Sequence, residues 1–501
     1  MRPYAIILAA GALCAGLAFA GDRPARGDLS AEDAARVARV TAPATDFSAA
    51  EKFEAMQGGA ATTVKAADAN VFSHPSANLG FPDQQRFLLG NGLFRKDWVS
   101  SPSSTQASDG LGPLFNARAC QSCHFKDGRG HAPSTPGEQA LSLLVRLSVP
   151  PDAEQRGAIE AGLLPAAPDP VYGFQLQDLA VAGVKPEGRI RIDWEEVPVS
   201  LAGGETASLR RPALSIGDPG YGDFDPAMMM SARVAPPMIG LGLLGAVAEA
   251  DILAREDPDD IDGDGISGRT SWRMGDGGQP VLGRFGWKAL EPSILTQTAH
   301  AFSGDMGLSS RISPDHWGEC TQAQADCRAM PHGAQERYGA EEVPGDLLDL
   351  VVFYSSHLAV PRRRDVDDPE VLAGKKLFYE TGCIGCHTPK YVTGRDAPDP
   401  AHRFQLIWPY TDMLLHDMGD DLADHREEGL AGGSEWRTPP LWGIGLSKTV
   451  NGEASFLHDG RARTLLEAVL WHGGEAQAAR DAVVEMDAKD RAALVRFLES
   501  L

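Results

Sequence analysis

The sequence predicts a mainly α-helical protein with two similar halves, a partly β insertion in the first half and an N-terminal arm. The duplication is predicted by three short segments that recur in the same order along the chain. They are Gly90-x-x-Leu93-Phe94 and Gly374-x-x-Leu377-Phe378, Pro236-Pro237-x-x-Gly240-x-Gly242-Leu243 and Pro439-Pro440-x-x-Gly443-x-Gly445-Leu446, and Leu350-Val351-x-Phe353 and Leu494-Val495-x-Phe497. The last pair lies in helical patterns that close each half. One such pair can arise by chance, but three in one order indicate duplication.

Each half carries a Cys-x-x-Cys-His motif between the first and second of these segments. The motifs are Cys120-Gln-Ser-Cys123-His124 and Cys383-Ile-Gly-Cys386-His387. In c-type haem attachment, two thiols at this spacing bind the haem vinyl groups and the adjacent histidine is the proximal iron ligand. A thioredoxin-like thiol pair and half of a zinc site are the alternatives. Because the motif occurs twice, with no further cysteine pair at zinc-site spacing, we expect two covalent c-type haems in two cytochrome c-like domains.

The repeat sets the domain boundaries. We expect cytochrome c-like domain 1 over residues 78–360 and domain 2 over residues 366–501, with a charged, proline-bounded linker at 361–369. An arm with helical stretches precedes them at 21–77. Domain 1 has a large insertion at about 140–215, in which apolar or alternating runs at 141–149 and 188–199 predict strands.

Residues 1–20 have the pattern of a signal peptide. Arg2 precedes an apolar run at 4–17 and an Ala-x-Ala pattern at 18–20, which predicts cleavage before about Gly21. A membrane anchor is the alternative, but the run is shorter than the roughly 20 residues that a bilayer requires. A lipoprotein site at Cys14 matches its pattern poorly. We therefore expect an exported, periplasmic protein without a membrane span.

The third cysteine pair outside this segment is Cys320 and Cys327. No histidine adjoins either residue, and an oxidising compartment favours a local disulfide. A redox-active thiol pair is the alternative.

The formal net charge of −23 argues against nucleic acid as a partner, because phosphate binding needs a basic face. The same charge steers a basic partner toward the protein, such as a small redox protein that gives or takes electrons.

The distal ligands of the two irons are less certain from sequence than the proximal ones. Asp305-Met306-Gly307 and Asp417-Met418-Gly419 repeat one tripeptide, once in each half, and methionine is a common haem ligand. Met306 and Met418 are therefore candidates, with core packing as the alternative. The competing histidines are His416, His458 and His472 for the second haem and His300 for the first.

A candidate calcium site lies at Asp260-Ile-Asp262-Gly-Asp264-Gly265. Alternate carboxylates at this spacing open a Ca²⁺-binding loop. The closing position holds Ser271 in place of glutamate, so a solvated acidic turn without an ion is the alternative.

Several segments resemble those of the bacterial di-haem oxidoreductase family, whose members are named as peroxidases or thiol oxidoreductases. They are Gly112–Asn116, Lys126–Gly130, Arg233–Leu243, Phe285–Lys288, Leu414–Gly419, Phe456–Arg463 and Trp471–Glu475. The resemblance covers roughly residues 50–501. The second half also resembles the C-terminal half of di-haem cytochrome c peroxidases and of the related tryptophan-oxidising enzymes. The resemblance implies an all-helical double cytochrome c fold and no particular substrate.

Two haems in one chain suit a division of labour, in which one iron accepts electrons from a carrier and the other meets hydrogen peroxide. Cleavage of the O–O bond needs a proton donor and acceptor. His458 beside Asp459, and His472 near Glu475, are the candidate catalytic residues. Hydrogen bonds to a haem propionate or to the backbone are the alternative role of both histidines.

Arg461 and Arg463 are candidate partners for a haem propionate, since a guanidinium group pairs bidentately with a carboxylate. The main functional prediction is a peroxidase-like di-haem oxidoreductase. The alternatives are an electron-transfer cytochrome without catalysis of its own, and a thiol- or metal-directed oxidoreductase. Two six-coordinate haems would favour the electron-transfer cytochrome. One haem with an open coordination position on its iron would favour the peroxidase-like enzyme.

Overall fold

The computed structural model describes residues 25–501 apart from 136, 336, 338 and 454, so the predicted signal peptide and Cys14 lie outside the described residues. The helices are α1 (Ala31–Thr41), α2 (Phe81–Phe94), α3 (Cys120–Cys123), α4 (Ala153–Glu160), α5 (Leu241–Gly245), α6 (Glu249–Leu253), α7 (Ile294–Met306), α8 (Ala325–Arg328), α9 (Gly345–Ser356), α10 (Pro369–Glu380), α11 (Ser447–Asn451), α12 (Leu465–Leu470), α13 (Gln477–Glu485) and α14 (Ala488–Ser500). None of these helices is long and apolar enough to cross a membrane.

The strands form seven two-stranded sheets in the described part of the chain. They are β1 (Val99–Ser100) with β2 (Asp109–Leu111), β3 (Leu114–Phe115) with β5 (Leu179–Ala180), β4 (Leu143–Ser148) with β8 (Met229–Val234), β6 (Arg189–Ser200) with β7 (Thr206–Gly217), β9 (Trp272–Met274) with β10 (Pro280–Leu282), β11 (Tyr391–Val392) with β12 (Leu406–Ile407), and β13 (Leu415–Asp417) with β14 (Glu435–Arg437). The fold is therefore helical with small sheets, and the all-helical expectation is wrong even in the second half, which holds β11 to β14.

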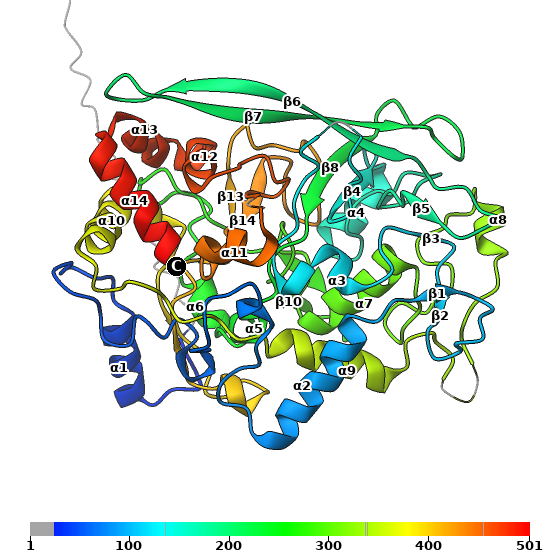
Figure 1. Cartoon of the computed structure of the whole chain (residues 1–501), viewed down its shortest axis with the longest axis horizontal. Coiled ribbons are helices and arrows are strands. Elements are labelled where there is room, and N and C mark those ends of the chain that lie inside the picture. Colours follow the sequence, from blue (N-terminus) through cyan, green and yellow to red (C-terminus); the bar gives the residue numbers. More distant parts are fainter. Residues whose placement is uncertain (1–24, 136, 336, 338, 454) are drawn as a thin grey trace, which may run out of the picture.

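The repeated segments form two matching helix pairs (Figure 1). Helix α2 packs against α9, and α10 packs against α14. A glycine lies where the helices of each pair meet. A side-chain Cβ at Gly90 would lie 2.4 Å from the carbonyl oxygen of Leu350, and one at Gly374 would lie 1.9 Å from that of Ala493. These distances are too short for any side chain, which explains why both copies of the first repeated segment carry glycine.

The two Pro-Pro segments pack against each other. A Cβ at Gly240 would meet the Trp442 ring, and a Cβ at Gly443 would meet the Ile239 side chain. Both glycines have a left-handed backbone, with φ of 72° and 73°. The two copies of the second repeated segment therefore turn in the same way at this glycine and make reciprocal contacts between the halves.

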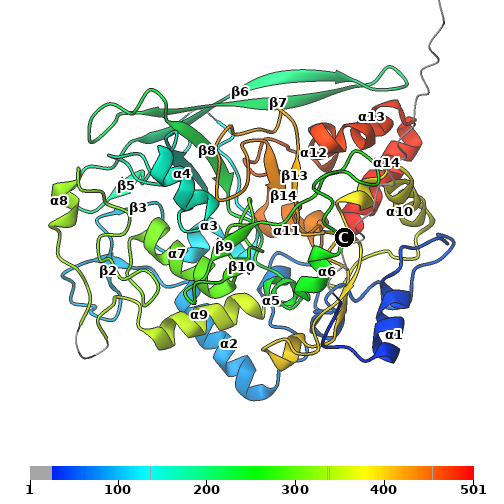
Figure 2. The same cartoon turned by 180° about the vertical axis from the view of Figure 1, so that it is seen from behind.

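The insertion in the first half contains the predicted strands. Strand β4 falls within the predicted run at 141–149, and β6 coincides with the run at 188–199. Strands β6 and β7 form a long hairpin along one edge of the molecule (Figures 1 and 2). Leu201 and Leu209 of this hairpin join the apolar core around α10, α12 and α14. The insertion thus covers the second half as well as the first.

The N-terminal arm packs on the body through buried charges. Glu54 is 1% exposed and forms ion pairs with Arg363 and, at 2.9 Å, with Lys375. Glu51 also pairs with Lys375, at 2.9 Å. Since Arg363 and Lys375 are themselves almost fully buried, these carboxylates fix the arm to the second half.

Candidate functional site

The first Cys-x-x-Cys-His motif forms α3 and the residue after it. The Nδ1 atom of His124 lies 2.8 Å from the carbonyl oxygen of Pro236. A carbonyl only accepts hydrogen bonds, so Nδ1 donates and the ring lone pair is on Nε2. Burial lowers the pKa of His124 to about 4. The ring is therefore neutral, and Nε2, the nitrogen that would bind iron, is left free.

The second motif repeats this arrangement with a different carbonyl. His387 donates through Nδ1 to Tyr410, at 2.9 Å, and burial lowers the pKa of His387 to about 4. The rings of Phe94 and Phe378, from the repeated helices, lie 6.2 Å and 6.0 Å from the two proximal histidines. Tyr410 precedes the second Pro-Pro segment, whereas the partner of the first histidine belongs to the first Pro-Pro segment.

Both motifs face one cavity of about 1350 Å³. Its wall includes the four motif cysteines, which are free thiols, the two proximal histidines and both Pro-Pro pairs. Four thiols and two imidazoles with free Nε2 atoms, on the wall of one large cavity, fit two c-type haems.

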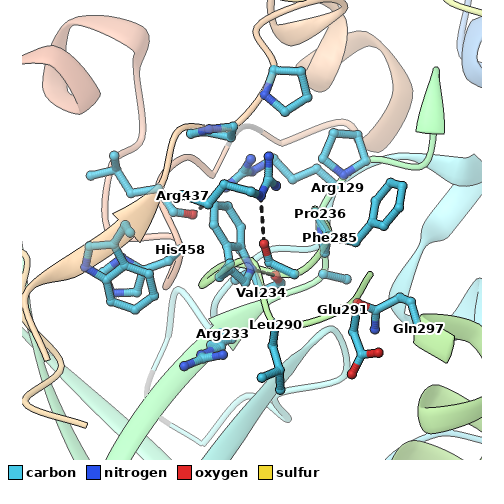
Figure 3. A pocket seen from close by; sticks show the side chains of 18 of the residues that line it. Arg129, Arg233, Val234, Pro236, Phe285, Leu290, Glu291, Gln297, Arg437 and His458 are labelled. Atoms are coloured by element: carbon cyan, nitrogen blue, oxygen red, sulfur yellow. Dashed lines mark hydrogen bonds between the residues drawn. The ribbon is translucent and has the colours of Figure 1, made fainter. Parts of the chain in front are cut away.

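Two buried arginines on the cavity wall have no carboxylate partner among the described residues (Figure 3). Arg129 donates to the carbonyl of Ser455, and Arg437 donates to that of Gly286 at 2.9 Å. Burial lowers the pKa of each guanidinium to about 10. A buried cation without a direct ion-pair partner is suited to a haem propionate.

The predicted propionate partners lie elsewhere. Arg461 is bound to Asp459, with Nη2 and Oδ2 2.8 Å apart. Arg463 is half-exposed and pairs with Glu196 at 3.0 Å and Glu467 at 3.1 Å. Neither arginine is among the residues that line the cavity. Since both are already neutralised, the structure favours the two buried arginines of the wall.

His472 lines the cavity near the second proximal histidine. Its Nδ1 atom lies 2.8 Å from the carbonyl oxygen of Ala468 and so donates, which leaves Nε2 with a lone pair. His472 is also close enough to His387 for its charge to lower the pKa of that ring, after the larger effect of burial. His472 would therefore have one nitrogen free to bind the iron of a haem at the second motif, or to exchange a proton.

His416 is held by two carboxylates. Its Nε2 lies 2.8 Å from Asp412 and its Nδ1 lies 2.7 Å from Glu475. Burial opposes a charge on the ring, yet the two carboxylates keep the pKa of His416 well above its ordinary value. Neither nitrogen is therefore available to iron. Glu475, predicted as a partner of His472, instead binds His416 and accepts from Ser267 at 2.8 Å.

His458 lies on the cavity wall, stacked on Trp436 with ring centroids 3.7 Å apart. Burial lowers the pKa of His458 to about 4. The predicted partner Asp459 is next to it, with Nε2 and Oδ2 3.5 Å apart, but this carboxylate is engaged by Arg461. His458 and Asp459 therefore lie next to each other, but the Asp459 carboxylate already forms an ion pair with Arg461.

Both candidate methionines line the cavity. Met306 ends α7 and is 2% exposed, in the apolar core with Phe302. Met418 follows β13 and is partly buried. Their position agrees with a role as distal ligands and equally with core packing.

An acidic group near the first motif has no counterpart in the sequence predictions. The Oε1 atom of Glu291 lies 2.7 Å from Nδ1 of His300 on α7, and the Oε2 atoms of Glu291 and Glu319 are buried without a hydrogen-bond partner. Asp305, at the end of the same helix, adds to the effect of burial in raising the pKa of Cys120 to about 12. Helix α7 therefore carries His300, which binds Glu291, and Asp305, which is close enough to Cys120 to affect its pKa.

The charge of the acidic group is partly balanced. Arg146 lines the cavity and interacts with the carboxylates of Glu319 and Asp305. In Figure 3, Glu291 lies on a different side of the cavity from His458. The cavity thus has two separate sets of titratable groups.

The site residues that were not predicted differ in how much the sequence alone indicates about them. Arg129 lies five residues after the first motif, in a segment covered by the family resemblance, so its position could have suggested a role. Glu291 lies in no local pattern, and only the fold pairs it with His300, the histidine predicted as a candidate ligand of the first haem.

The predicted calcium segment is an acidic turn. Asp260 and Asp262 lie with Asp257 so that one oxygen of each is within 4.8 Å of the others, whereas Asp264 is outside this group. Several of the carboxylate oxygens accept backbone N–H groups of the turn. Calcium binding stays a prediction, which a Ca²⁺ titration of chelator-treated protein would check.

Cys320 and Cys327 form the predicted disulfide, with Cα atoms 6.3 Å apart. Both are buried, in a small apolar cluster with Leu114. This position fits a structural role.

Comparisons with known proteins identify the family. No curated protein matches the sequence. A solved structure of hydrazine synthase from Kuenenia stuttgartiensis, pressurised with xenon, is 13% identical over 71% of this chain and 89% of that chain, with a TM-score of 0.27. A TM-score this low does not establish a shared fold. The family model described as "Di-haem oxidoreductase, putative peroxidase" matches residues 52–501, and the chain therefore belongs to the di-haem oxidoreductase family.

Proposed function

We propose that this protein is an exported, periplasmic c-type di-haem oxidoreductase of the peroxidase type, which takes electrons from a small redox protein and delivers them to hydrogen peroxide. The observation that carries the proposal is the single cavity onto which both Cys-x-x-Cys-His motifs open. Haem iron, when bound, supplies the one-electron chemistry and a site for a small oxidant.

The two sites differ in a way that supports unequal roles. His472 lies near the second proximal histidine with a free Nε2. The pKa of His124 is set by burial and by the Pro236 carbonyl, with no contribution from another histidine of the described residues. The second site thus suits electron entry with two imidazole ligands, and the first suits contact with peroxide.

Proton handling at the first site is assigned to Glu291. His300 and Arg273 bind its Oε1 atom, at 2.7 Å and 3.2 Å, and leave the buried Oε2 without a partner. Burial raises the pKa of Glu291, but His300 and Arg273 outweigh it and hold the pKa below its ordinary value. The carboxylate is therefore ionised at neutral pH and can accept a proton from peroxide.

The proposal is tested by electron paramagnetic resonance of the oxidised holoprotein, followed by rapid mixing of half-reduced protein with peroxide. We expect one low-spin signal from a bis-imidazole haem, a second signal from a haem with a weak or missing distal ligand, and rapid consumption of peroxide. Two six-coordinate low-spin haems that do not react with peroxide would contradict it.

An electron relay without catalysis is the second candidate function. It is favoured by Met306 and Met418, since both line the cavity and a thioether can occupy the distal position of a haem. A sulfur-to-iron absorption band from both haems, together with electron transfer to a partner protein, would support the relay.

A further inference from the structure

A second group of metal-binding side chains lies outside the haem cavity, where the end of α9 meets the second half. His357 follows α9 directly, Asp399 caps the start of the short 3-10 turn at Pro400–His402, and His402 is the last residue of that turn. One ligand atom from each of the three residues lies within 4.8 Å of the other two. The residues that line the haem cavity do not include any of them.

The hydrogen bonds of His357 fix which of its nitrogens is free. Nδ1 lies 2.8 Å from the carbonyl oxygen of Phe353 and must donate to it. In the neutral ring, the lone pair is then on Nε2, which faces Oδ2 of Asp399 at 3.0 Å. The two atoms form an ion pair if the ring is protonated, whereas in the neutral ring Nε2 is buried without a hydrogen-bond partner. Two acceptors this close repel each other unless a cation lies between them.

His402 adds a second unpartnered nitrogen. Its ring stacks on that of His357, with centroids 4.7 Å apart, and its Nε2 is also buried without a hydrogen-bond partner. His402 is 3% exposed and His357 is 1% exposed. A proton shared by His357 and Asp399 would leave His402 unsatisfied, which folded proteins avoid for buried polar atoms.

We propose that His357, Asp399 and His402 bind one divalent transition-metal ion, for which Zn²⁺ is the best match. Two imidazoles and one carboxylate are typical zinc ligands, whereas Ca²⁺ and Mg²⁺ prefer oxygen ligands only. Zinc–ligand distances of about 2.0–2.2 Å place tetrahedral ligand atoms roughly 3.3 Å apart, close to the 3.0 Å between His357 and Asp399.

The surroundings fit a bound ion. The Asp399 side chain is 36% exposed, which provides an entry path and room for a water molecule as the fourth ligand. The donation from His357 to Phe353 is the outer hydrogen bond that orients most metal-binding histidines. The ion would join the closing helix of the first half to the 399–402 segment of the second.

The proposal is tested on the haem-loaded, full-length mature protein after treatment with a chelator. Zn²⁺ is added in equilibrium dialysis, and zinc and iron are counted by mass spectrometry of the elements. We expect one zinc for every two irons. Asp399→Asn and His402→Gln should each weaken zinc binding by at least about 10–100-fold, the effect of losing even an outer partner.

His425→Gln is the matched control, because His425 is exposed and belongs to none of the clusters of possible metal ligands among the described residues. It should bind zinc as the wild type does. X-ray absorption at the zinc edge of the wild type gives a measurement that needs no variant, and should show imidazole nitrogens with a carboxylate or water oxygen. Less than one zinc per chain, zinc binding unchanged in both site variants or lost in the control, or a spectrum without imidazole would each overturn the proposal.

Discussion

The substitution Glu291→Gln tests the proton acceptor of the first haem site. The glutamine side chain keeps the size of glutamate, and its carbonyl oxygen can still accept the hydrogen bond from His300, which is 2.7 Å long in the wild type. What changes is Oε2, the buried oxygen without a partner. An amide NH₂ group in its place cannot accept a proton.

The expected decrease in the reaction rate follows from the loss of this one proton acceptor. Removal of a general acid–base group typically costs about 10²–10⁴-fold in rate, which corresponds to about 3–5 kcal/mol in the activation barrier. We therefore expect the rate constant for reaction with peroxide to fall by this factor in Glu291→Gln. The assay is stopped-flow mixing of half-reduced protein with hydrogen peroxide, followed in the Soret band.

The matched control is Glu427→Gln, since Glu427 is on the surface, 3.4 Å from Arg156, and its side chain is 44% exposed. The control should react as the wild type does, and both variants should keep two haems and the wild-type spectrum. If Glu291→Gln reacts within about twofold of the wild type with its haems intact, the assignment of Glu291 is wrong.

Three further predictions concern the haem ligands and the arm. His472→Gly should open the second haem, so that its low-spin signal is lost and then restored by added imidazole; an unchanged spectrum would place the ligand elsewhere. Cys123→Ala and Cys386→Ala should each lose covalent attachment of one haem, while the mass of the wild type should show two haems on a chain starting at residue 21. Glu54→Gln should destabilise the protein by about 3–5 kcal/mol in denaturant unfolding, because Arg363 is almost fully buried and would lose its carboxylate; a stability within about 0.5 kcal/mol of the wild type would show that the arm is held in another way.

The features that could be predicted from the sequence are those with a local rule. Haem attachment needs two thiols and a histidine at fixed spacing, so the motifs at 120–124 and 383–387 are recognisable without a fold. The helix pairs were predictable because close contact between helices demands glycine, at Gly90 and Gly374. The strands at 141–149 and 188–199 follow from alternation.

The features that could not be predicted depend on partners far along the chain. The carbonyl that orients His387 comes from Tyr410, before the second Pro-Pro segment, although the repeat points to that segment itself. Arg129 and Arg437 are held on the cavity wall by the carbonyls of Ser455 and Gly286, which are 326 and 151 positions away. Arg461 and Arg463 are a different case, because their partners Asp459 and Glu467 are close in the sequence and the propionate prediction did not take them into account.

The hydrogen bond between His124 and Pro236 has a consequence for how the protein is made. The two residues are 112 positions apart, and the β insertion lies between them. Proteins emerge from the ribosome N-terminus first, so the first motif is made long before the carbonyl that orients its histidine. A chain ending before residue 236 would carry a complete attachment sequence, yet its imidazole would turn freely and bond to water. If the first motif binds haem as proposed, attachment could occur early, but the His124 ring would reach its final orientation only after most of the first half has arrived.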